Sequence, residues 1–115
     1  ISRDGYSSHY TRDIIRNRIY EIWKSTRNIK KNADYVAAAN LATATSLYIS
    51  EHPKEVEISD KDNEKIIDTS TLKSKQYINY EPKPQSEGDK FVIKLLKDGE
   101  IQVLSNNKIF YPKSE

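Results

Sequence analysis

Mostly apolar residues recur at every seventh position through the first half of the chain, with a second series interleaved between them. A repeat of this kind places both series on one face of an α-helix. The pattern predicts one long helix, capped near Ser8 or Thr11 and stopped at His52 and Pro53. The two series are Ile15, Ile22, Ile29, Val36 and Thr43, and Ile19, Thr26, Ala33, Asn40 and Leu47.

The two halves of this predicted helix differ in the size of their side chains. From Ala33 to Ser50 the helix is rich in Ala, Thr and Ser, which leave a thin surface that a sheet or a second helix can approach closely. The first half instead carries isoleucines and Trp23 between arginines, and such a stripe is exposed unless something covers it. Two interpretations are open: the stripe folds back on its own core, or it packs on another helix.

The second half of the chain predicts a sheet. Pro53 to Thr71 is a polar connecting loop in which Glu64–Leu72 forms a short helix, with expected core contacts at Ile66, Ile67 and Leu72. The predicted strands are Gln76–Tyr80, Lys90–Leu96, Glu100–Leu104 and Lys108–Tyr111.

Two dipeptides mark the turns of this sheet. Asp98-Gly99 predicts a type I′ hairpin turn, in which both central residues take positive φ, and Asn106-Asn107 is a weaker signal of the same kind. Phe91, Ile93 and Leu95 alternate with polar residues, so one face of the sheet can cover the alanine-rich helix.

These elements predict an α+β fold, with a long N-terminal α-helix packed against a small antiparallel β-meander of three to four strands. The helix should contact the sheet through its small residues. The expected packing residues are Ala38, Leu41, Ala42, Thr45 and Tyr48 on the helix, and Phe91, Ile93 and Val103 on the sheet.

Charge divides the chain more sharply than its total of +2 suggests. Residues 1 to 31 carry eight Arg and Lys against three acids, a net charge of +5, whereas the rest carries eleven Lys against fourteen acids, a net charge of −3. All five arginines precede residue 28. The basic segment 1–31 is thus of different origin from the head 32–115, or it faces an acidic partner. In the head we expect the helix to end at about residue 51, a loop at 52–74 and the sheet at 75–111.

The sequence offers no enzyme chemistry that we recognise. His9 and His52 lack the third group that orients an activated nucleophile, and the acids of the Asp60–Glu64 loop lack the glycine of a calcium-binding loop. There is no cysteine. We expect a non-catalytic protein with no metal site and no cofactor.

The order of motifs resembles the soluble part of a type IV pilin or pseudopilin of Gram-positive bacteria. The resemblance covers Asn32 to Val103. It is carried by Lys31–Asp34, Ala38–Ala44 and Tyr48 in the helix, then by Leu72, Tyr77-Ile78, Pro82–Pro84 and the hairpin Phe91–Val103.

This resemblance implies a structural subunit of an extracellular, cell-surface filament that serves adhesion, motility or secretion. The implied partners are other pilin subunits in a homo-oligomeric filament, and a host surface for an adhesive fibre. Such subunits are anchored in the membrane before assembly by an apolar N-terminal helix, which this sequence lacks. Residues 1 to 31 depart from the family pattern, because they are amphipathic and basic.

The alternative from a different class is a DNA-binding or DNA-uptake protein. The segment Tyr10–Lys31 mixes cations with aromatic rings, which suits phosphate contact and base stacking. The candidate nucleic-acid contacts are Arg12, Arg16, Arg18 and Trp23. The plainer interpretation is a solvated basic face beside a buried stripe.

Overall fold

The computed structural model describes residues 2 to 113, with side chains described from residue 14 onward. The chain divides into two compact units, Ile1–Lys30 and Lys31–Glu115, and the helix α1 (Ser2–Glu51) runs through both. The helix begins well before the predicted caps at Ser8 and Thr11, and it ends directly before His52. Over the described residues, no helix combines the length and the apolar content needed to cross a bilayer.

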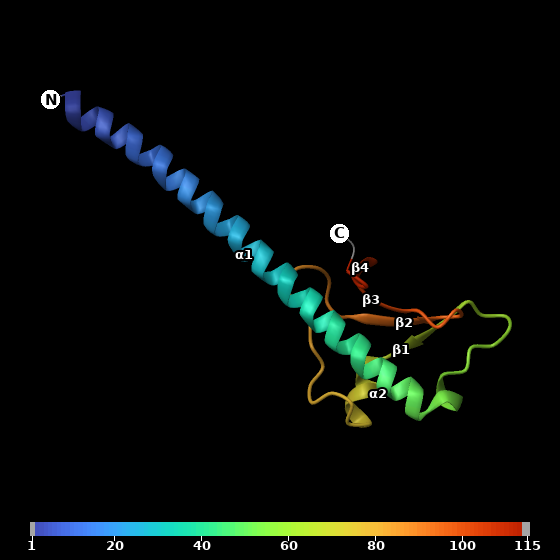
Figure 1. Cartoon of the computed structure of the whole chain (residues 1–115). Coiled ribbons are helices and arrows are strands. Elements are labelled where there is room, and N and C mark those ends of the chain that lie inside the picture. The colour runs from blue at the N-terminus through green and yellow to red at the C-terminus, as the bar shows by residue number, and fades with distance from the viewer. Residues whose placement is uncertain (1, 114–115) are drawn as a thin grey trace. The chain divides into compact units, whose positions relative to one another are not determined.

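The second unit contains a four-stranded antiparallel sheet in the order β1-β2-β3-β4 (Figure 1). The strands are β1 (Glu64–Ile67), β2 (Val92–Leu96), β3 (Ile101–Ser105) and β4 (Lys108–Tyr111). A 3₁₀ turn, η1 (Pro53–Val56), follows α1, and a short helix, α2 (Thr69–Ser74), follows β1. The second half of α1 packs on the sheet, which confirms the predicted α+β fold.

One predicted strand is wrong and an unpredicted one replaces it. Gln76–Tyr80 is not a strand, because Gln76 takes a left-handed φ of 68°. Its N–H bonds the carbonyl of Lys73, and the N–H of Tyr77 bonds that of Leu72, which together cap the end of α2. The fourth strand is β1, which pairs with β2 through Ile67 and Ile93. The first half of the segment predicted as the helix Glu64–Leu72 is therefore strand β1. The sheet thus begins within residues 52–74, which were expected to form a loop.

The turn with two residues of positive φ is Asn106-Asn107 and not Asp98-Gly99, which the sequence predicts more strongly. In the pair Asp98-Gly99 only Gly99 has positive φ, 93°, so the type I′ prediction is wrong. The turn is stabilised instead by Asp98, whose Oδ1 accepts the N–H of Glu100 at 2.9 Å. Asn106 and Asn107 both take positive φ, 52° and 64°, and form the two-residue turn between β3 and β4.

The core lies between the small-residue side of α1 and one face of the sheet. Phe110 of β4 is fully buried and meets Tyr35 of α1 and Phe91 edge-on, at centroid distances of 5.4 and 6.2 Å. A register shift in β3 between Val103 and Leu104 buries neighbouring residues that simple alternation would have exposed. Ile67 and Leu72 are buried as expected, but Ile66 is 49% exposed and is not a core contact.

Candidate functional site: the helix–sheet interface

The predicted packing residues all lie in the helix–sheet interface. Ala38, Leu41, Ala42, Thr45 and Tyr48 of α1 are buried, as are Phe91, Ile93 and Val103 of the sheet side. The alanines present only methyl groups to the core, and the hydroxyl of Thr45 donates to the carbonyl of Leu41 at 2.7 Å. No polar group of Thr45 is therefore left unpaired in the core.

One charged residue, Asp34, is buried on this same side of α1. It is 1% exposed, and both of its carboxylate oxygens accept hydrogen bonds from the loop that follows the Pro82–Pro84 segment. Oδ1 accepts the N–H of Gln85 at 2.7 Å, and Oδ2 accepts the N–H and the hydroxyl of Ser86 at 2.8 and 2.5 Å. We call this contact the Asp34 clamp. It satisfies the carboxylate and holds the proline-rich loop against the helix.

The same loop is held a second time by the sheet. Ser105 of β3 donates its hydroxyl to the carbonyl of Glu87, and Asn106 donates to the Glu87 carboxylate at 3.0 Å. Gly88 lies beside this contact with a φ of 76°, and a Cβ at that position would collide with the Ser105 hydroxyl. The loop is thus fixed to both layers of the head, and glycine is required at its closest approach.

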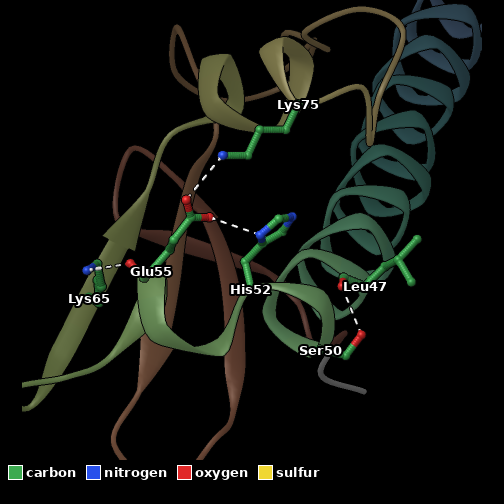
Figure 2. Close-up of polar contacts among 6 residues, drawn as sticks. All are labelled: Leu47, Ser50, His52, Glu55, Lys65 and Lys75. Carbon is green, nitrogen blue, oxygen red and sulfur yellow. Dashed lines mark hydrogen bonds and ion pairs between the residues drawn. The ribbon is translucent and has the colours of Figure 1, made fainter.

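A polar cluster surrounds Glu55, in η1 at the end of α1 (Figure 2). Its carboxylate lies 3.4 Å from Nδ1 of His52 and 3.3 Å from Nζ of Lys75, and its carbonyl accepts a hydrogen bond of 3.0 Å from Lys65. These groups are open to solvent, where ion pairs contribute about 0 to 1 kcal/mol. The cluster joins η1 to β1 and to the end of α2 without adding much stability.

Two tyrosines lie beside this cluster. The ring of Tyr48 is 5.6 Å, centroid to centroid, from those of His52 and Tyr77. Burial raises the pKa of Tyr48 above the ordinary tyrosine value, and the Glu55 charge adds to the effect. Burial likewise raises the pKa of Tyr77, with help from the Glu51 carboxylate. Both hydroxyls therefore stay neutral to higher pH in the folded protein than in the unfolded chain.

An open groove of about 470 Å³ lies between the end of α1 and the β2–β3 hairpin. Its lining is mainly aliphatic, including Ile49, Ile58 and Ile101, with the backbone of the turn at Gly99 on one side. Ser46 contributes the one hydroxyl, and it already donates to the carbonyl of Ala42 at 3.0 Å. The groove offers an apolar contact surface rather than a set of reactive groups.

The candidate nucleic-acid contacts lie outside this interface. Arg16, Arg18 and Trp23 are exposed on the first part of α1, and the side chain of Arg12 lies outside the described residues. Between residues 14 and 113, no three His, Cys, Asp or Glu side chains gather in a way that could hold a metal ion.

Sequence reasoning missed the Asp34 clamp and the buried Ser105. The available signal for Asp34 is its spacing from Ala38, Leu41, Ala42 and Thr45, which places an acid on the apolar side of an amphipathic helix. A buried acid needs a donor, but the sequence does not say which backbone supplies it.

Comparison with protein families, with curated proteins and with solved structures finds no match for this sequence. The function is therefore inferred from the packing and the exposed surfaces of the chain.

Proposed function

We propose that the chain is a structural, non-catalytic subunit of an extracellular type IV pilus or pseudopilus filament. The observation that supports it most is the packing of an alanine-lined helix on an antiparallel meander, in which Ala38, Leu41, Ala42 and Tyr48 are both core residues and part of the pilin resemblance. The proposed partners are further copies of the chain, assembled at the cell surface. Adhesion, motility and secretion are the roles such a fibre would serve.

The outer side of α1 supports repeated contact between subunits. Val36 and Leu47 are 60% and 52% exposed, on the side of the helix away from the buried Ala38 and Leu41. Both side chains are available for contact with another protein. In a filament each subunit would cover them with a neighbouring copy.

Immunogold electron microscopy tests the proposal. Antibodies raised against the chain should label surface fibres on intact cells that produce it, and sheared fibres should contain it. Label confined to the cell interior, or fibres without label, would contradict a filament role.

A substitution then tests the outer side of the helix. Val36→Asp places a charge on the exposed aliphatic surface and should remove the chain from sheared fibres while its circular dichroism stays normal. Ile66→Asp, which places the same charge on an exposed isoleucine of β1, is the matched control. Normal incorporation of Val36→Asp would exclude this side of α1 from subunit contact.

A further inference from the structure

An apolar stripe runs along the first part of α1. Every side chain from Ile15 to Lys30 is exposed, and five large apolar ones lie within roughly 120° of the helix circumference. Their exposed fractions range from 50% at Ile19 to 68% at Trp23. The stripe consists of Ile15, Ile19, Ile22, Trp23 and Ile29.

Cations border this stripe on both edges. At helical spacing, Arg16 and Arg27 lie beside one edge and Arg18 beside the other. Lys30, at the end of the segment, falls within the arc of the stripe, beside Trp23. Glu21, the one acid of the segment, lies on the opposite side of the helix. Residues 14 to 30 carry five basic residues against this acid, a net charge of +4.

This distribution of charge decides among the surfaces that could cover the stripe. A second copy in a two-helix coiled coil would bring Arg16 and Arg18 beside the stripe of a partner bordered by the same cations, and like charges there oppose association. Nucleic acid would use the cations but leave four isoleucines in water. A bilayer with acidic lipids matches both features, since acyl chains accept the stripe and headgroups pair with the cations at its edges.

We propose that residues 14 to 30 of α1 bind the surface of an anionic lipid bilayer, with the helix axis in the plane of the membrane. The isoleucines enter the boundary between headgroups and acyl chains, and Trp23 lies at that depth. The arginines extend their charged ends back toward the lipid phosphates. This surface is separate from the helix–sheet interface and does not depend on the proposed filament.

Trp23 is the sole tryptophan of the chain, so its fluorescence reports this segment alone. Titrating the full chain with phosphatidylcholine vesicles that contain about one-third phosphatidylglycerol should shift the emission to shorter wavelength. Pure phosphatidylcholine vesicles should give little shift. Salt at about 1 M, where the Debye length is about 3 Å, should reverse the shift.

Charge removal measures the electrostatic part. Replacing Arg16, Arg18 and Arg27 by Gln should weaken binding to the anionic vesicles on the order of 100-fold, at about fivefold per cation. The matched control makes the same change at three exposed lysines of the second unit, Lys61, Lys73 and Lys83. This control should bind like the parent chain.

Removal of apolar surface measures the other part. Ile22→Ser should weaken binding roughly tenfold, because it removes an aliphatic side chain from the centre of the stripe. Ile66→Ser, at an exposed isoleucine of β1, should have no effect. Circular dichroism of each variant verifies that the helix is retained.

Four results would overturn the proposal. The first is no fluorescence shift with anionic vesicles, and the second is equal binding to neutral and anionic vesicles. The third is binding to duplex DNA, with a steep salt dependence, by a chain that does not bind vesicles; this would assign the segment to nucleic acid. The fourth is a dimer formed through the stripe, detected by sedimentation velocity, in a chain that does not bind vesicles. None of these results bears on the immunogold test of the filament.

Discussion

Replacement of Asp34 by Asn is expected to cost the head about 2 to 4 kcal/mol of unfolding free energy. The amide has one acceptor oxygen, whereas the Asp34 oxygens accept three hydrogen bonds, from Gln85 and from two groups of Ser86. Whichever way the amide turns, its NH₂ group faces the N–H of Gln85 or that of Ser86, which lie 2.7 and 2.8 Å from the two carboxylate oxygens. The remaining hydrogen bonds then go to a neutral amide in place of a charged carboxylate. A hydrogen bond to a charged group contributes about 1.5 to 3 kcal/mol, and an unpaired buried donor costs about 1 to 3.

The assay is differential scanning calorimetry together with amide hydrogen exchange. For a unit of this size the loss corresponds to a melting temperature lower by roughly 10 to 25 °C. The N–H groups of Gln85 and Ser86 should exchange faster than in the parent chain. Asp89→Asn, the same change at an exposed position of the same loop, is the control and should be nearly neutral. A loss below about 0.5 kcal/mol in Asp34→Asn, or unchanged exchange at the two amides, would refute the account of the clamp.

Three further predictions concern the head. Ala42→Trp should overpack the helix–sheet interface, where Ala42 is 2% exposed, at about 1 to 3 kcal/mol; an unchanged melting temperature would count against the packing described here. Gly88→Ala should lower the free energy of unfolding in urea by about 2 to 4 kcal/mol, because it adds a collision with Ser105 to the strain of positive φ. In the control Gly99→Ala the new Cβ meets open space, so the decrease should be only about 1 kcal/mol. Equal decreases in the two variants would contradict the collision. The raised pKa of Tyr48 stabilises the fold fully below pH ~10, and this contribution is lost as pH rises through the folded pKa. The melting temperature of Tyr48→Phe should therefore fall less steeply than that of the parent as pH rises above about 10, and parallel curves would contradict the effect.

The helix and most of the sheet could be predicted because their signals are local. Ala38, Leu41, Ala42 and Thr45 repeat at the spacing of one helical face, and Pro53 cannot continue the helix. Strand β2 follows from the alternation of Phe91, Ile93 and Leu95, and β4 follows from the Asn106-Asn107 turn before it. Each of these signals lies within the element that it predicts or within two residues of it.

The errors arose where distant residues decide the local structure. Glu64–Ile67 has no alternation of its own, and its extended form depends on pairing with β2 about thirty residues later. Tyr77 and Ile78 have the composition of a strand, but the left-handed Gln76 that caps α2 breaks the extended backbone that a strand at Gln76–Tyr80 needs. The Asp34 clamp joins residues more than fifty positions apart, so the sequence around Asp34 does not predict which residues bond its carboxylate.

This separation along the sequence has a kinetic consequence. The second half of α1 can form from neighbouring residues alone, whereas the clamp requires closure of a chain segment of 51 residues or more. We therefore expect the clamp to be absent from the folding transition state. In stopped-flow measurements, Asp34→Asn should leave the refolding rate almost unchanged and place most of its effect on the unfolding rate. A slowed refolding limb would mean that the loop docks early. If the expectation holds, the buried carboxylate governs how long the folded head lasts, and hardly affects how fast it forms.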